Sequence, residues 1–172
     1  MKSAFAIGLF LLTSGFAQAK TATVIINKID EKGVGSQIGV LQLEDTTEGL
    51  RITPSLNGLP PGQHGFHVHS KSECGPGDDK GKLAAGMAAG GHLDQMNTGK
   101  HLGPQSGGGH TGDLPVLVVD DKGVASTPVV APHLKVDDME GHSFMIHAGG
   151  DNYSDQPAAL GGGGARIACG AS

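Results

Sequence analysis

The sequence predicts an all-β protein with a single domain. Its apolar residues occur in short runs rich in Val, Ile and Leu, and turns containing Gly and Pro separate most of these runs. No segment keeps a helical spacing of apolar residues over three turns. Many short strands joined by such turns are typical of a β-sandwich or a β-barrel.

About eight strands are expected along the chain. Most mix β-branched with polar residues, as a half-buried strand does, and the later ones are more continuously apolar. The expected strands are 21–30, 34–44, 49–54, 63–69, 115–121, 124–131, 143–148 and 165–170. The dipeptide Lys122-Gly123 joins the fifth strand to the sixth and predicts a hairpin there.

Between the fourth and fifth strands lies a long stretch, 70–114, without a clear strand pattern. A connection of this length is uncommon in a compact domain unless it is functional, disordered or fastened. This stretch contains Cys74 and three histidines, so fastening by a disulfide and a metal is the economical interpretation. The run 107–109 is all glycine and would permit the tight turns that bring His101 and His110 to one ion.

Histidines gather in three places and predict a metal site. His67 and His69 lie two apart in an expected strand, so both rings can face one ion. The long stretch holds three histidines nine residues apart, followed by an aspartate: His92, His101, His110 and Asp113. His147 lies in a later apolar strand. Imidazole and carboxylate ligands suit zinc or copper, and two adjacent metals fit these groups better than one.

Residues 1–19 have the pattern of a secretory signal. Lys2 gives a positive start, an apolar run follows, and Ala17-Gln18-Ala19 forms a small-residue cleavage site. An uncleaved membrane anchor is the alternative, but the apolar run is too short to span a bilayer, and no other run approaches spanning length. The signal carries one lysine and no acid, so cleavage leaves the domain, 20–172, more negative than the full-chain charge of −5. That charge balance does not suit a nucleic-acid-binding protein.

Two cysteines, Cys74 and Cys169, occur in a chain expected to enter an oxidising compartment. A disulfide is therefore predicted, which would tie the long stretch to the last strand. On the chain-entropy model, closing a loop of this size contributes about 4 to 5 kcal/mol. Two free thiols or two thiolate ligands remain the alternatives, although nothing in the spacing brings the cysteines together as ligands.

Five segments together resemble the bacterial copper,zinc superoxide dismutases. They read HGFHVH at 64–69, GGH at 90–92, GHTGDLP at 109–115, HAGGD at 147–151 and GARIACG at 164–170. All five occur in the family's order, and the resemblance extends from about residue 21 to the end of the chain. It implies an eight-stranded Greek-key barrel in the bacterial periplasm, present as a monomer or a homodimer.

The resemblance also implies two metals that share one histidine. Copper would be held by His67, His69, His92 and His147. Zinc would be held by His92, His101, His110 and Asp113. The His92 imidazolate would then bridge the two ions, and the closed four-ligand shell would make zinc structural. Copper would be alternately reduced and reoxidised by the substrate, superoxide, with dioxygen and hydrogen peroxide as products.

Further roles follow from the same resemblance. Arg166 would hold superoxide beside copper through its permanently charged fork, and His92 would supply a proton. Asp151 would connect His67 and His101, because metal-bound imidazoles commonly donate their second N–H to a carboxylate.

The other histidines are expected outside the site, with His64 serving the fold and His133 and His142 in surface or loop positions. Other functions stay open. A metal-buffering protein would need only the ligands, but that interpretation leaves Arg166 unexplained. A zinc hydrolase would need an open position on zinc, and an adhesive β-sandwich would not require seven metal-binding side chains.

Overall fold

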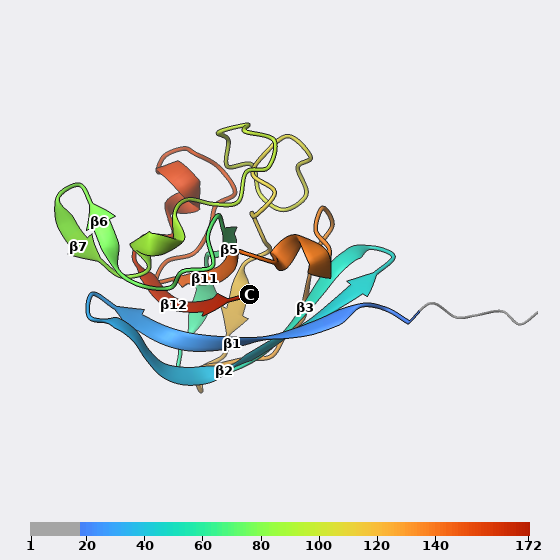
Figure 1. The fold of residues 1–172 in the computed structure, drawn as a ribbon, viewed down its shortest axis with the longest axis horizontal. Coiled ribbons are helices and arrows are strands. Elements are labelled where there is room, and N and C mark those ends of the chain that lie inside the picture. The colour runs from blue at the N-terminus through green and yellow to red at the C-terminus, as the bar shows by residue number, and fades with distance from the viewer. Residues whose placement is uncertain (1–17) are drawn as a thin grey trace, which may run out of the picture.

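In a computed structural model, the structure describes residues 18–172, which form an all-β domain (Figure 1). The predicted signal, 1–19, falls almost wholly outside the described residues. Among residues 18–172, no helix has the length and apolar character needed to cross a membrane.

The main sheet has eight strands and curls into a Greek-key β-barrel, as predicted. The strands hydrogen-bond in the order β10-β3-β2-β1-β12-β11-β5, and β9 also pairs with β3. Their bounds are β1 Thr21–Asp30, β2 Gly33–Thr46, β3 Gly49–Asn57, β5 Phe66–His69, β9 Val124–Ala125, β10 Val129–Ala131, β11 Ser143–His147 and β12 Arg166–Ala171. The first strand, β1, pairs antiparallel with the last, β12, so hydrogen bonds join the two ends of the domain.

Two additional strands extend the wall of the barrel. β4, Gly62–His64, pairs antiparallel with β8, Leu117–Val119, and the chain passes from β4 into β5 through Gly65. The expected strand 63–69 is therefore interrupted once, and the expected strand 124–131 is divided into β9 and β10.

The expectation that 70–114 lacks strands was wrong in one place. A short hairpin forms there, with β6 at Gly77–Asp79 and β7 at Lys82–Ala84. Each strand has only three residues, none of them buried, so no alternation of apolar and polar residues marks them. Three single-turn 3-10 helices also occur among the described residues: η1 Met87–Ala89, η2 Val136–Met139 and η3 Ala159–Gly162.

The core lies inside the barrel and follows from the two-residue period of the strands. In β1, Val24 and Ile26 are buried, whereas Ile25 between them is exposed. Phe66 and Phe144 stack at 5.8 Å between ring centroids in the interior. Each fully buried apolar side chain of this size contributes about 1.5–3 kcal/mol.

The same alternation separates core from site in β5 and β11, which are buried on both faces. Phe66 and Val68 of β5 point into the core, so His67 and His69 must lie on the opposite face. Met145 of β11 pairs directly with His67 in the antiparallel register. The next residue on that face of β11 is His147, which carries its ring toward the same region.

The predicted disulfide is present between Cys74 and Cys169, whose Cα atoms are 5.6 Å apart. It fastens the long stretch to β12 and packs with Ile29 and Met145 in a small apolar cluster outside the barrel. Figure 1 shows the stretch 70–114 and the segment between β11 and β12 gathered on one side of the strands.

Candidate metal centre

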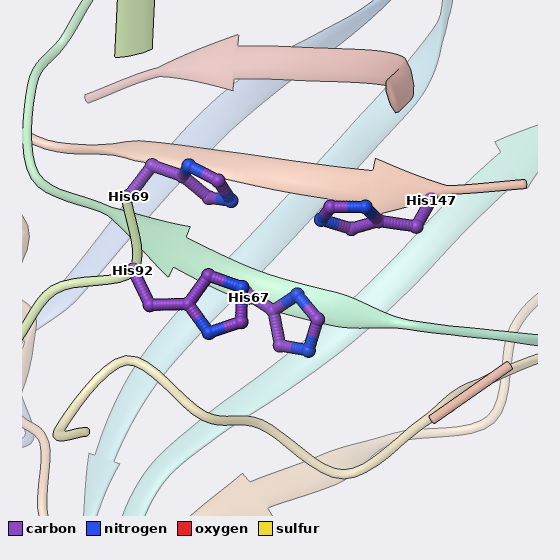
Figure 2. Close-up of side chains that lie close together, drawn as sticks. All are labelled: His67, His69, His92 and His147. Carbon is purple, nitrogen blue, oxygen red and sulfur yellow. The ribbon is translucent and has the colours of Figure 1, made fainter. Parts of the chain in front are cut away.

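Four histidine rings from three separate segments converge on one space, as Figure 2 shows. β5 supplies two of the rings, β11 the third, and the long stretch the fourth: His67, His69, His147 and His92. One ring nitrogen from each lies within 4.8 Å of those of the others. All four side chains are buried, so the group can surround a small ion.

The long stretch reaches the strand through a ring of three main-chain hydrogen bonds. Val68 N donates to Gly112 O at 2.9 Å, Leu93 N donates to Val68 O at 2.8 Å, and Gly112 N donates to Leu93 O at 2.8 Å. Each of these residues is next in sequence to a candidate ligand. Val68 lies between His67 and His69, while the other two adjoin a histidine or an aspartate of the long stretch.

A second group of four consists of three histidines arranged around the carboxylate of Asp113. Three imidazole Nδ1 atoms approach Asp113 Oδ1, those of His92 at 2.9 Å, His101 at 3.0 Å and His110 at 3.3 Å. His110, the most exposed of the set, is only 9 % exposed. His92 belongs to both groups of four, so its ring lies between the two candidate ion positions.

The first group is arranged so that each strand histidine has one nitrogen held and one left over. His67 Nε2 contacts Asp151 Oδ2 at 2.8 Å, His69 Nδ1 contacts Gly90 O at 2.9 Å, and His147 Nδ1 contacts Gly164 O at 3.1 Å. A nitrogen facing such an oxygen carries the proton, and the other nitrogen then offers a lone pair.

Within residues 18–172, six buried side-chain atoms lack a hydrogen-bond partner, and five of them are ring nitrogens of candidate ligands. The five nitrogens are His67 Nδ1, His69 Nε2, His101 Nδ1, His110 Nδ1 and His147 Nε2, and the sixth atom is Ser143 Oγ. Burying five polar atoms without partners is costly, and a metal ion accepts such lone pairs. The donor atoms present therefore fit two divalent ions held by imidazole and carboxylate.

The protonation states of the strand histidines suit this role. Burial lowers the pKa of His67 to about 3 and that of His147 to about 4. Burial also lowers the pKa of His69 and, together with smaller charge effects, that of His92. These rings are neutral at neutral pH, which is the form that binds metal.

In the metal-free protein the pKa of His101 is shifted in the opposite direction, upward. Burial favours its neutral form, but contacts with the carboxylates of Asp113 and Asp151 raise its pKa to about 9. Its hydrogen bond to Asp151, between Nε2 and Oδ1, is 2.8 Å long. Ion binding at Nδ1 must therefore displace a proton from this ring.

Asp151 lies between one ring of each group. It contacts His67 through Oδ2 and His101 through Oδ1. Gly161 covers this contact so closely that a Cβ there would lie 2.0 Å from Asp151 Oδ1 and 2.8 Å from His101 Nε2. Gly161 also has a φ of +71°, which glycine adopts without strain.

Arg166 is held at the edge of the first group by two carbonyl oxygens. One terminal nitrogen donates to Gly86 O at 2.7 Å and the other to Gly90 O at 2.8 Å. The Gly90 carbonyl also accepts from His69, so a single oxygen fixes both the arginine and a ring of the first group. The guanidinium is half-buried and stays charged.

The remaining histidines lie outside the two groups. His64 is buried, with Nδ1 2.7 Å from His147 O and Nε2 2.8 Å from Pro60 O, so it links a turn to β11. His133 is exposed, and His142 lies in the turn before β11.

Two contacts of the site were missed from the sequence. The Asp155 carboxylate accepts the backbone N–H of His101, and the Tyr153 hydroxyl accepts the backbone N–H of Val116. Both residues lie in the polar segment between β11 and β12, where no spacing of residues indicates a partner.

A Greek-key barrel that carries two four-residue metal groups with one shared histidine is the framework of a binuclear metalloprotein. Comparison with known proteins identifies the family. The family model described as copper/zinc superoxide dismutase matches residues 37–172. The chain belongs to this family.

Similar proteins cover nearly the whole chain. "Superoxide dismutase [Cu-Zn] 2" of Salmonella typhimurium is 54% identical over 161 residues, which is 93% of this chain and 92% of that protein. The structure of the Cu/Zn superoxide dismutase from Brucella abortus superposes with a TM-score of 0.86 at 46% identity, covering 88% of this chain and 99% of that one. The monomeric copper, zinc superoxide dismutase from Salmonella enterica gives a TM-score of 0.79 at 52% identity, with 88% and 99% covered.

Proposed function

We propose that this protein is an oxidoreductase that dismutes superoxide. Two superoxide anions and two protons give one dioxygen and one hydrogen peroxide, and no other reductant is needed. The observation that carries the proposal is the position of His92 in both ligand groups, beside a doubly anchored arginine. A protein that only stores metal has no need of either arrangement.

The copper ligands in this proposal are His67, His69, His92 and His147. The zinc ligands are His92, His101, His110 and Asp113. The unpartnered ring nitrogens support this division, because three lie in the first group and two in the second. Copper, when bound, supplies the one-electron exchange with superoxide, whereas zinc has a full set of protein ligands.

The protein itself contributes charge and proton transfer. Arg166 presents a cation at the edge of the first group and holds the anionic substrate there. His92 directs Nδ1 at Asp113 Oδ1, which leaves Nε2 as the ring atom that can take up and release a proton. Because burial lowers the pKa of His92, a proton held at Nε2 is readily given up.

The test is the rate at which superoxide disappears after pulse generation, with residues 20–172 either loaded with copper and zinc or metal-free. We expect copper-dependent turnover near the diffusional range of about 10⁸–10⁹ M⁻¹s⁻¹. His147→Ala should lose copper and turnover together. Stoichiometric metal binding without turnover would instead make the protein a metal-buffering protein, which is the alternative function.

Location and assembly complete the proposal. We propose cleavage after Ala19 and a periplasmic domain, supported by the signal pattern of the sequence and by the bacterial relatives. Amino-terminal sequencing of protein from the periplasmic fraction tests it, and an intact Lys2 there would contradict it. The Salmonella enterica relative is described as monomeric, which favours a monomer here over a homodimer. Sedimentation at micromolar concentration distinguishes the two.

A further inference from the structure

Asp155 has no role in the function proposed above, and its side chain joins two distant parts of the site. We propose that Asp155 is a positioning residue for the four proposed zinc ligands, called the zinc group below. Asp155 holds the main chain of His101, while Asp151 holds its ring. The inference rests on the zinc ligands assigned above and goes beyond them, because Asp155 is not itself a ligand.

The contact that carries the proposal is long-range. Asp155 Oδ2 accepts the backbone N–H of His101 at 2.9 Å, although the two residues are 54 positions apart. The other oxygen, Oδ1, accepts the backbone N–H of Leu160 at 3.1 Å. One carboxylate therefore ties the long stretch 70–114 to the segment between β11 and β12.

The two aspartates fix His101 at two points. Asp155 fixes its backbone, and Asp151 Oδ1 fixes ring atom Nε2 at 2.8 Å. The other ring atom, Nδ1, then points into the zinc group and lies 3.0 Å from Asp113 Oδ1. The chain beside His101 has other anchors, because Leu102 N donates to Asp113 Oδ2 and His110 N donates to Lys100 O. Loss of Asp155 removes the partner of the His101 N–H itself, which gives the ring more freedom to move Nδ1 out of the ligand set.

The second contact of Asp155, with the backbone of Leu160, holds the residues that cover the His101 ring. Leu160 has a φ of +55°, which is uncommon for a residue with a side chain, and it immediately precedes Gly161. Gly161 covers the contact between Asp151 and His101. By accepting the Leu160 N–H, Asp155 holds this cover in position and limits access of water to the carboxylate–imidazole pair.

The charge of the Asp155 carboxylate is consistent with its two hydrogen bonds. Hydrogen bonds from the backbone of His101 and then of Leu160 lower the pKa of Asp155, so the carboxylate is ionised and accepts both bonds at neutral pH. Hydrogen bonds to an ionised acceptor are stronger than those between neutral groups.

An ordinary turn residue is the competing explanation, and Asp120 supplies a matched control for it. Asp120 Oδ1 accepts the backbone N–H groups of Lys122 and Val124 at 2.9 and 2.8 Å in the turn between β8 and β9. It therefore makes two hydrogen bonds of the same kind as Asp155, yet touches no candidate ligand.

The experiment measures zinc affinity in copper-free, full-length domain by competition with a chromophoric chelator, together with the ligand-field spectrum of Co²⁺ bound in place of zinc. Asp155→Ala should weaken zinc binding about tenfold to a hundredfold, the range for partners that orient metal ligands, and should shift the Co²⁺ spectrum. Asp155→Asn keeps one acceptor oxygen and should give a smaller loss. Asp120→Ala should change neither readout.

The result that overturns the proposal is wild-type zinc affinity and an unchanged Co²⁺ spectrum in Asp155→Ala. If Asp155→Ala does not fold, Asp155→Asn decides, and no weakening there overturns the proposal equally. Failure of the zinc assignment is visible separately, because His110→Ala should weaken zinc binding whatever residue 155 is. Unchanged zinc binding in His110→Ala would remove the assignment, and with it the basis of this inference.

Discussion

The main chain of Gly112 rests directly on the carbonyl of Val68. A Cβ at Gly112 would lie 2.3 Å from Val68 O, and the N–H of Val68 already donates to Gly112 O at 2.9 Å. Gly112 immediately precedes Asp113, and Val68 separates two histidines of the other group. This approach sets the spacing between the two groups of ligands, and only a residue without a side chain permits it.

Gly112→Ala should therefore disturb both metal groups. The new methyl group must push the long stretch away from β5, which we expect to cost about 1–3 kcal/mol of folding stability and to reduce both copper and zinc content. Metal analysis after dialysis and denaturant unfolding measure the two effects. Gly91→Ala is the control, because a Cβ at Gly91 meets nothing within 4 Å although it adjoins His92. Equal metal content in both variants would contradict the prediction.

Arg166→Lys tests whether the fixed fork matters beyond its charge. Lysine keeps the positive charge but cannot reach both Gly86 O and Gly90 O with two separate nitrogens in one plane. We expect copper and zinc content to stay the same while superoxide turnover per copper falls several-fold. Arg51→Lys, at an exposed ion pair with Glu44, should leave turnover unchanged. Lost copper in Arg166→Lys would indicate a structural role instead.

The metal-free protein should be most stable close to neutral pH. Burial lowers the folded-state pKa of His67 to about 3 and of His147 to about 4, so the unfolded chain binds more protons below about pH 6.5. Stability should then fall as the pH drops from about 6.5 toward 4. His101 has the opposite shift, to about 9, so the folded chain binds the extra proton above pH 6.5. Its contribution is lost as the pH rises through 9.

Denaturant unfolding of metal-free protein between pH 4 and pH 10 checks this profile. Loading with zinc should remove the alkaline decline, because an ion at Nδ1 takes the place of the His101 proton. A profile that keeps rising from pH 7 to pH 10 without metal would mean that His101 is neutral in the folded protein.

Removing the disulfide should affect more than stability. Cys74→Ser is expected to lower the free energy of unfolding by about 4 to 5 kcal/mol on the chain-entropy model, since the bond closes a 95-residue separation. Cys74 also adjoins Gly75, whose carbonyl accepts the N–H of Ala88 in the turn that carries Gly86 and Gly90. Turnover per copper should therefore fall together with stability. Equal free energies of unfolding for Cys74→Ser and the disulfide-bonded wild-type protein would contradict the prediction.

The sequence predicted the strands well where burial alternates with exposure. β1 was expected at the bounds that it has, because 21–30 mixes β-branched with polar residues and the turn Lys32-Gly33 follows. The hairpin of β6 and β7 could not be predicted, because its residues bury nothing and its turn depends on Lys80 and Gly81 in positive-φ conformations. The division of 124–131 was missed because its two halves pair with different parts of β3.

The candidate ligands were predictable because chemistry and spacing coincide in them. His67 and His69 share one face of a strand, and the nine-residue spacing in the long stretch marks His101. The five-segment family pattern includes the remaining ligands, His92, His110, Asp113 and His147. Asp155 was not predictable. It lies in a polar segment without periodicity, and its hydrogen bond to His101 arises only when two distant loops fold against each other. Nothing in the neighbouring residues indicates this contact.

The pairing of β5 with β11 has a consequence for how the protein is made. His67 and His147 become neighbours only when the chain beyond β11 is available to pair, and the arginine beside them lies later still, in β12. A nascent chain, or one threaded unfolded through an export channel, therefore has no assembled copper site to fill. Metal loading must then wait for the compartment in which the whole domain folds, so the metal supply of that compartment determines which ions the protein receives.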